Sequence, residues 1–299
     1  EKVEMADASV VDGTTITFWH SMGGVNGEAI DTLVKKFNDE NEYGITVDAQ
    51  YQGEYDDSLN KLKSAQIGNM GADLVQVYEI GTRFMIESGW IVPMQSMVNA
   101  DEYDTSVLEP NLAAYYTIND MLYSMPLNSS TPLMYYNKDI LDAAGVEVPT
   151  TWEELSAACE ALKAYDDSIY PWGIDMTTDE GQAAFSYYTW NNGGGFVDEN
   201  GDWALNSDKN VEALNFAVGL VNDGYTNSDP ANETRYDLQD MFGAGKVAMM
   251  IGPNNIPTYL SDGGYEVNYE VASIPSNEGC DSVAMGVCDR LEVFKDDAA

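Results

Sequence analysis

Basic residues are scarce in this chain of 299 residues, which has 13 lysines and arginines against 51 aspartates and glutamates and a formal net charge of −38. Nucleic-acid phosphates and anionic lipid surfaces are held by clustered lysine and arginine, so this balance argues against both kinds of partner. The scattered acids are typical of a solvated surface that keeps a protein soluble and monomeric. No apolar run approaches the roughly 20 residues of a membrane-spanning helix.

Cysteine and histidine are also rare, with three cysteines and one histidine in the chain. They are too few for a disulfide scaffold and too far apart for a zinc site. Cys159 lies on the small-residue face of an expected helix, which predicts a buried free thiol. Cys280 and Cys288 are eight residues apart around an expected turn, a spacing that leaves a local disulfide open. We expect neither a metal site nor a cofactor.

The sequence motifs of common enzymes are absent. There is no G-x-S-x-G of α/β-hydrolases, no G-x-x-x-x-G-K-[ST] of nucleotide-binding loops and no H-E-x-x-H of metalloproteases. His20 is the single histidine, so a serine or cysteine triad could be built in one place only. It lies at the end of the first expected strand, where a hydrogen-bonded structural histidine and a ligand contact are both reasonable interpretations. We expect no catalytic residues.

Apolar residues are plentiful enough to fill a core, at 44% of the chain with 11% aromatics. In the first part of the chain, strand-like alternation and helix-like spacing follow one another. The expected strands are residues 14–19, 45–51 and 72–78, and the expected helices are residues 26–38, 58–67 and 82–88. This β-α-β-α order predicts an α/β domain whose helices cover a mostly parallel sheet.

A second unit of the same kind starts near Pro126. Its expected strands are residues 133–136, 172–176 and 247–251, with a hairpin at 197–204, and its expected helices are residues 138–144, 182–190, 210–222, 236–242 and one that begins at Thr151. The segment TWEE at 151–154 has the capping-box spacing of a helix start. We therefore predict two α/β lobes, the first of residues 14–125 plus 275–299 and the second of residues 126–274. A crevice between two such lobes is the usual place for a small ligand.

Aromatic, amide, hydroxyl and carboxylate side chains collect at the ends of the expected strands. Flat aromatic rings suit the apolar faces of a sugar or polyol, while amides and carboxylates pair with its hydroxyl groups. Each of these residues alone is common in a core or a cap, whereas the collection favours a small-ligand site. The candidates of this kind are Trp19, His20, Tyr55, Tyr78, Glu79, Ser129, Ser130, Trp172 and Asn254.

Seven short segments carry a family resemblance. FWHSMGG at 18–24, YQGEY at 51–55, QVYEIGT at 76–82, NSSTP at 128–132 and YYNKD at 135–139 are similar to the glycerol-3-phosphate-binding proteins of Ugp-type ABC importers. PTTWEEL at 149–155 and GKVAM at 245–249 resemble the broader group of extracellular carbohydrate-binding proteins of ABC importers, the maltose-binding-protein-like group. The resemblance runs from about Thr14 to Val293.

This resemblance implies an α/β, two-lobed fold of the type II periplasmic-binding-protein kind, with a ligand cleft between lobes that close by a hinge. It implies a monomer outside the cell, either a membrane-anchored lipoprotein or periplasmic, that presents a small-molecule ligand to an ABC permease. The ligand contacts of the Ugp-like branch fall here on Tyr55, Glu79, Ser130 and Gly286. The chain departs from that branch at GPNN, residues 252–255, which replaces a serine, and at residues 179–182, which lack a tryptophan.

The two ends of the chain carry expectations of their own. Residues 1–13 are polar and acidic and lack the basic start and apolar stretch of a signal peptide. We interpret them as the flexible beginning of a mature or trimmed chain. Relatives of this type usually continue with helices after they re-enter the first lobe, so the resemblance predicts a truncated chain or a lost tail.

The sequence favours a non-catalytic binding protein that captures a neutral saccharide or polyol. A phosphate in a dry site needs compensating donors, and none of the three arginines, Arg83, Arg235 and Arg290, lies in a matched cleft motif. Glu79 would also repel a phosphate placed beside it. The Ugp-like segments favour the alternative, a glycerophosphate-type ligand. A secreted glycoside-processing enzyme that uses paired carboxylates such as Glu79 and Asp175 is a third hypothesis.

Overall fold

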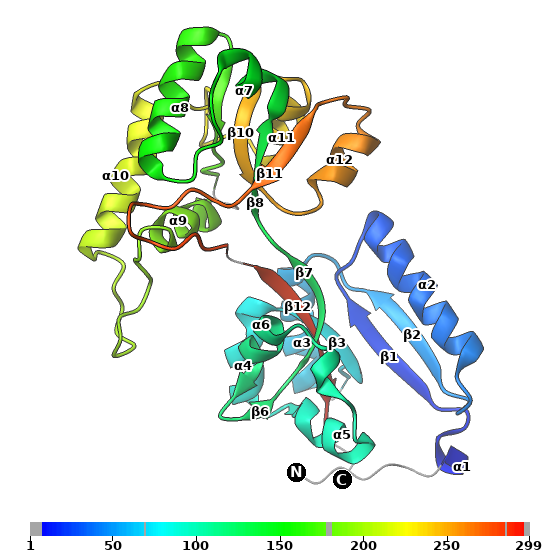
Figure 1. Cartoon of the computed structure of the whole chain (residues 1–299). Coiled ribbons are helices and arrows are strands. Elements are labelled where there is room, and N and C mark those ends of the chain that lie inside the picture. Colours follow the sequence, from blue (N-terminus) through cyan, green and yellow to red (C-terminus); the bar gives the residue numbers. More distant parts are fainter. Residues whose placement is uncertain (1–7, 69, 178–180, 285, 296–299) are drawn as a thin grey trace. The chain divides into compact units, whose positions relative to one another are not determined.

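The computed structural model describes residues 8–68, 70–177, 181–284 and 286–295, which form two compact units (Figure 1). Unit 1 consists of Glu1–Ser129 and Val287–Ala299, and unit 2 consists of Ser130–Gly286. The chain therefore leaves unit 1 once and returns to it once. Each unit has its own sheet and its own hydrophobic core, and each is described by itself.

The sheet of unit 1 has the strand order β2-β1-β3-β12-β4, and β7 also pairs with β12. β1 runs parallel to β2 and β3, whereas β12 runs antiparallel to β3 and β4. The strands are β1 Thr15–His20, β2 Thr46–Tyr51, β3 Leu74–Tyr78, β4 Ile91–Val92, β7 Met125–Ser130 and β12 Val287–Phe294, with a separate pair, β5 Thr117–Ile118 and β6 Met121–Leu122. Because β1 and β3 are parallel neighbours, their carboxyl ends meet at the same edge of the sheet.

The helices of unit 1 alternate with its first strands, as predicted. They are α1 Ala8–Val11, α2 Gly24–Glu40, α3 Tyr55–Ile67, α4 Thr82–Ser88, α5 Met94–Asp101 and α6 Pro110–Tyr115, with the 3-10 turns η1 Glu79–Gly81 and η2 Thr105–Val107. Asn38 ties α2 to β2, because its side chain donates to the Val47 carbonyl at 2.9 Å and accepts from the Val47 N–H at 2.7 Å. Leu62 of α3, Val75 of β3 and Met85 of α4 pack together in the core.

The sheet of unit 2 has the strand order β11-β8-β10-β9, in which β10 is antiparallel to β8 and parallel to β9. Its strands are β8 Leu133–Asn137, β9 Tyr170–Gly173, β10 Val247–Gly252 and β11 Tyr269–Ala272, and its helices are α7 Lys138–Ala144, α8 Trp152–Tyr165, α9 Gly181–Trp190, α10 Asp208–Asn222, α11 Arg235–Gly243 and α12 Ile256–Asp262. The strand predicted at residues 172–176 ends earlier in the structure, since β9 stops at Gly173. The next N–H, that of Ile174, donates to the Asn227 side chain at 2.9 Å instead of to a neighbouring strand. Val197 and Trp203 form an antiparallel bridge, which confirms the predicted hairpin.

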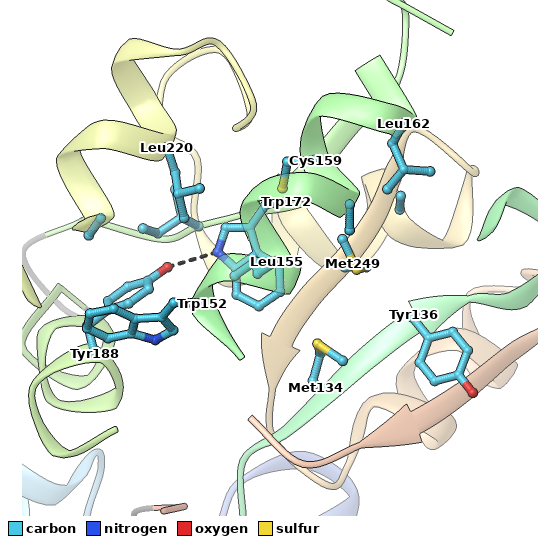
Figure 2. Packing of buried hydrophobic residues seen from close by; sticks show 14 of the residues in the cluster. Met134, Tyr136, Trp152, Leu155, Cys159, Leu162, Trp172, Tyr188, Leu220 and Met249 are labelled. Atoms are coloured by element: carbon cyan, nitrogen blue, oxygen red, sulfur yellow. Dashed lines mark hydrogen bonds between the residues drawn. The ribbon is translucent and has the colours of Figure 1, made fainter. Parts of the chain in front are cut away.

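Helix α8 begins with the predicted capping box. The Thr151 hydroxyl accepts from the Glu154 N–H at 3.2 Å, and the Glu154 carboxylate accepts from the Thr151 N–H at 3.2 Å. The apolar face of α8 packs on the core of unit 2, part of which Figure 2 shows. Trp172 lies in this core, and its indole N–H donates to the Tyr188 hydroxyl at 2.8 Å (Figure 2).

The chain returns to unit 1 only after Gly286, whereas the sequence analysis began the returning segment at residue 275. Hydrogen bonds hold the intervening segment on unit 2. The Asn191 side chain donates to the Val283 carbonyl and accepts from the Val283 N–H, both at 2.8 Å. Backbone hydrogen bonds also join Ser276 to the start of α8. Residues 275–286 thus belong with unit 2 in the structure.

The three cysteines are free thiols. Cys159 is buried, as predicted. The local disulfide that the sequence left open is not formed in the structure, and Cys288 is buried in β12.

Two predicted segments lie partly outside the described residues. Of the predicted flexible start, residues 1–7 lie outside the described residues, and Ala8–Val11 form α1. Residues 178–180, within the segment that lacks the tryptophan of the Ugp-like branch, also lie outside them. Across the described residues, no helix has the length and apolar character to cross a membrane.

Candidate functional site

The side chains around Asp289 form a hydrogen-bonded cluster at one edge of the unit 1 sheet. Asp289 is 1% exposed. Its Oδ2 accepts from the Tyr55 hydroxyl at 2.7 Å, the Gln76 amide at 2.8 Å and the Asn128 amide at 2.8 Å. Hydrogen bonds to an ionised acceptor are stronger than neutral ones, so this carboxylate fixes the orientation of all its partners.

The fold brings these residues to one edge from distant parts of the chain. Asp289 pairs opposite Tyr78, the last residue of β3. Tyr55 is the first residue of α3, which follows β2 closely. Gln76 lies within β3, and its side-chain oxygen accepts from the N–H of Ser21, just after β1, at 3.0 Å. The cluster thus lies at the carboxyl ends of parallel strands, where open α/β sheets place ligand groups.

Glu79 adds a carboxylate to this edge. It follows β3 directly and opens η1. Its Oε2 is buried and has no hydrogen-bond partner within the described parts of the chain. Burial raises the pKa of Glu79 and so does the nearby Asp289 charge, while its own backbone N–H and Arg290 act in the opposite direction. A buried acceptor without a partner is unfavourable, so Glu79 is a group that a ligand hydroxyl would stabilise.

Two stacked tyrosines interact with Glu79. The rings of Tyr55 and Tyr78 lie 5.2 Å apart with an angle of 15° between their planes. Burial, followed by the hydrogen bond to Asp56 at 2.6 Å, raises the pKa of Tyr78 to about 12. Burial and the hydrogen bond to Asp289 raise the pKa of Tyr55 as well. Both phenols therefore stay protonated at neutral pH, and the pair adds flat aromatic surface to this edge.

A buried ion pair lies on the same strand as Asp289. Arg290 and Glu292 are both 0% exposed, and Arg290 Nε lies 2.7 Å from Glu292 Oε1. Ser124 donates to the same Glu292 oxygen at 3.2 Å. Burial raises the pKa of Glu292, against the lowering effect of Arg290. The Arg290 charge is therefore balanced inside the protein and has no exposed surface to offer a phosphate.

A groove of about 520 Å³ opens in unit 1 next to Glu79. Its lining residues are Glu79, Ile80, Thr82, Arg83, Ile86, Glu87, Tyr115 and Ile118. Arg83 and Glu87 form an ion pair at 2.7 Å on the exposed side of α4. The volume falls within the range of about 300–1,000 Å³ typical of small-molecule pockets. Atoms of a ligand that reached Glu79 could therefore extend into this groove.

The other predicted contacts of unit 1 differ in exposure. Trp19 is half-buried, and its indole N–H donates to Gln50 at 3.2 Å. His20 is 3% exposed, and its Nδ1 accepts from the Met22 N–H at 3.3 Å. Burial lowers the pKa of His20, so the ring is neutral at pH 7. Ser129 is exposed near the end of β7.

The predicted contacts of unit 2 lie at its strand ends and at its boundary. Ser130 and Gly286 are neighbours, because a Cβ added at Gly286 would lie 3.4 Å from the Ser130 carbonyl oxygen. Asn254 is exposed and follows β10. Asp175 follows β9; its Oδ1 accepts from the Thr177 N–H at 2.8 Å, and its Oδ2 is buried without a partner among the residues described.

Trp172 requires a correction, because it is not placed as a ligand contact. Its side chain is 1% exposed and packs in the core of unit 2. Its polar atom is already bound to the Tyr188 hydroxyl. A tryptophan at a strand end can face the core or the solvent, and the sequence pattern alone did not distinguish the two.

Sequence reasoning missed the residues at the centre of the cluster. Asp289, Arg290 and Glu292 interrupt the otherwise apolar strand VCDRLEVF. Charged residues in such a strand signal a buried ionic group, since an unpaired buried charge is very unfavourable. Gln76 lies in the matched segment QVYEIGT but was not among the candidates. In the described ranges, no group of histidine, cysteine and acidic residues is arranged to hold a metal ion.

Comparison with known proteins finds a matching family and curated sequence relatives. The profile of the family described as bacterial extracellular solute-binding protein matches residues 23–279. The sn-glycerol-3-phosphate-binding periplasmic protein UgpB of Escherichia coli O1:K1 is 39% identical over 169 residues, which cover 54% of this chain and 37% of that protein. UgpB of Escherichia coli K12 is 38% identical over 169 residues, with the same coverage. The matched part of the chain thus spans little more than a third of these curated relatives.

Solved structures share the fold over nearly the whole chain. An ABC substrate-binding protein from Listeria monocytogenes, in complex with cycloalternan, has a TM-score of 0.78 and 25% identity, covering 96% of this chain and 72% of that one. UgpB from Mycobacterium tuberculosis, in complex with glycerophosphocholine, has a TM-score of 0.79 and 22% identity, with coverage of 95% and 71%. The likeness shows an α/β fold of the two-lobed periplasmic-binding-protein kind.

Proposed function

Because the chain belongs to the family of bacterial extracellular solute-binding proteins, we propose that it captures a small solute outside the cytoplasmic membrane and delivers it to the permease of an ABC importer. The family match confirms the resemblance found in the sequence motifs. The protein acts as a monomer, either free in a periplasm or held at the cell surface as a lipoprotein. It is a binding protein rather than an enzyme, as its relatives are.

The observation that carries the proposal is the Glu79 carboxylate beside the stacked tyrosines. Glu79 has a buried oxygen that lacks a partner within the described residues, and it follows a strand whose carboxyl end meets that of β1. Carboxylates accept hydrogen bonds from ligand hydroxyls, and aromatic faces pack on the C–H surface of sugars and polyols. We therefore assign Glu79 as the hydroxyl acceptor and Tyr55 and Tyr78 as its aromatic neighbours.

The charges at this edge favour a neutral ligand. Glu79, Asp289 and Glu292 supply carboxyl groups, and Arg290 is the guanidinium among them. A phosphate brought next to Glu79 would meet a net negative environment at low effective dielectric, where repulsion is strong. We propose a saccharide or polyol whose hydroxyl groups bind at Glu79 and whose body extends into the groove beside it.

A glycerophosphate-type ligand is the second candidate, favoured by the match to the sn-glycerol-3-phosphate-binding relatives. Its glycerol hydroxyls would bind at Glu79, and its phosphate would need donors elsewhere.

Isothermal titration calorimetry separates the two ligand classes. The probes are maltose, maltotriose, glycerol-3-phosphate and glycerophosphocholine, each at low and at high salt. Binding of the saccharides with little dependence on salt supports the first candidate, and salt-sensitive binding of the phosphates alone supports the second. Release of free sugar from a glycoside probe would instead show an enzyme and overturn the proposed function.

A further inference from the structure

Arg290 is a fully buried charge in the middle of a sheet, and the binding of a solute does not by itself explain it. A buried guanidinium is unfavourable unless its charge and its hydrogen-bond donors are matched, and Nη2 of Arg290 has no partner among the described residues. Its Nε pairs with Glu292 at 2.7 Å, and its Nη1 donates to the carbonyl of Tyr78 at 2.5 Å. Its guanidinium carbon also lies 5.4 Å from the centre of the Tyr116 ring. Arg290 therefore joins β12 to the last residue of β3.

The Tyr78 carbonyl belongs to the peptide group that joins Tyr78 to Glu79. Tyr78 ends β3, and Glu79 opens η1 at the next residue. The turn lies close to the guanidinium, because a Cβ added at Gly81 would be 3.7 Å from Arg290 Nη2 and 2.8 Å from a Val77 methyl carbon. The hydrogen bond from Arg290 thus fixes the backbone on which the Glu79 carboxylate is held.

The charge of Arg290 also acts on Glu79. Burial and Asp289 raise the pKa of Glu79, and Arg290 is the cation that lowers it. The other ionisable groups that interact with Glu79 are Tyr55 of α3, Tyr78 of β3, Tyr116 after α6 and Cys288 of β12, together with Arg83 and Glu87 of α4, which line the same groove. Arg83 is paired with Glu87 on the exposed side of α4, so its charge is screened by solvent.

We propose that Arg290 is a positioning residue for ligand binding: it fixes the junction of β3 and η1 through the Tyr78 carbonyl and supplies a buried positive charge beside that junction. This proposal rests on the proposed function in one respect, the assignment of Glu79 as the acceptor of ligand hydroxyls. Arg290 itself does not contact the ligand. It acts through the orientation and the ionisation of Glu79.

The test measures the ionisation of Glu79 without any ligand. The ¹³C chemical shift of the Glu79 carboxyl is followed against pH in the wild type, in Glu292→Gln and in the double variant Arg290→Gln/Glu292→Gln. The double variant removes both charges of the buried pair and so leaves no unpaired buried ion. Glu292→Gln keeps the Arg290 charge but removes its partner, so it serves as the control only if circular dichroism shows that it is folded. We expect the titration midpoint of Glu79 to move to higher pH in the double variant and to change little in the control.

The binding measurement uses whichever of maltotriose or glycerophosphocholine the wild type binds. Glu79 loses its charge as pH falls through its titration midpoint, and ligand affinity should fall with it. The pH below which affinity falls, the acid limit of binding, should therefore be higher in the double variant, by the same number of pH units as the Glu79 midpoint. At the pH of the wild-type acid limit, the double variant should bind the ligand roughly tenfold to hundredfold more weakly than the wild type, because a hydrogen bond to a charged acceptor is lost. Arg290→Lys keeps the charge but cannot reproduce the two separate donors of the guanidinium, Nε to Glu292 and Nη1 to the Tyr78 carbonyl. It should therefore move the acid limit less and speed hydrogen exchange at Ile80 and Gly81.

The outcomes separate this proposal from the proposed function. An unchanged Glu79 titration in the folded double variant refutes the positioning role, whatever the ligand. If the double variant does not fold, an Arg290→Lys variant with wild-type exchange at η1 and a wild-type acid limit of binding refutes it instead. If Glu79→Gln binds both probes with wild-type affinity, the assignment of Glu79 as acceptor fails, while the titration still decides whether Arg290 controls its charge.

Discussion

Replacing Asp289 with alanine should destabilise unit 1 more than replacing any exposed acid of the same sheet. The Oδ2 atom accepts from Tyr55, Gln76 and Asn128, so the substitution leaves donors without an acceptor. Each donor contributes according to its access to water. Gln76 is 2% exposed and cannot turn to solvent, so the N–H that loses Asp289 as its acceptor costs about 1–3 kcal/mol. Tyr55 is half-buried and adds about 1 kcal/mol, whereas Asn128 is exposed and adds little.

Together these terms predict a loss of roughly 2–4 kcal/mol in the free energy of unfolding of unit 1. Asp289→Asn keeps an acceptor oxygen in place, and its loss should be about 1 kcal/mol. Asp48→Ala is the matched control, because Asp48 lies exposed on β2 of the same sheet and accepts from Gln50 at 2.7 Å. A surface change of this kind usually stays within about 0.5 kcal/mol.

Urea unfolding by circular dichroism gives the global change, and hydrogen exchange of β3 and β12 peptides reports unit 1 separately. This separation matters because a protein of two units need not unfold in a single step. If Asp289→Ala and Asp48→Ala destabilise β3 and β12 equally, Asp289 is not the centre of the cluster. An Asp289→Asn variant as destabilised as Asp289→Ala would show that charge, rather than the number of acceptor positions, holds the donors.

Three further expectations follow from single contacts. Trp172→Phe should lower the free energy of unfolding by about 1–3 kcal/mol through the unpaired Tyr188 hydroxyl and leave ligand affinity unchanged in calorimetry, so a loss of affinity alone would restore its ligand role. Burial lowers the pKa of His20 below its ordinary 6.5, so as pH falls the unfolded state binds a proton on this ring before the folded state does, and the free energy of unfolding should decline below pH 6.5. The urea midpoint of His20→Gln should decline less over the same pH range, and an equal decline in both proteins would show that His20 is not responsible. Iodoacetamide added under denaturing conditions without reductant should modify Cys159, Cys280 and Cys288, whereas an intact mass with one adduct would reveal a disulfide.

Local patterns in the sequence predicted most of the elements. The capping box at Thr151 and Glu154 marked the start of α8, because those hydrogen bonds join residues three apart. The alternation of strands and helices predicted the α/β class, since side chains follow the period of their own element. The same patterns placed Glu79 at the carboxyl end of β3, where it provides the proposed acceptor.

Tertiary structure decided which polar residues meet. Tyr55 and Asp289 are 234 positions apart in the chain, and the antiparallel register of β12 on β3 brings them into contact. The apolar pattern within a single segment does not predict which residues of a distant strand it will pair with. The sequence by itself therefore could not single out Asp289 among the other acidic residues. The burial of Trp172 was open for the same reason, because the face that a strand-end side chain turns inward depends on the helices packed against it. Local sequence thus determined the helices, the strands and the segments shared with the family. The pairing of β12 with β3 determined that the carboxylate of Asp289 and the guanidinium of Arg290 lie near the turn that holds Glu79.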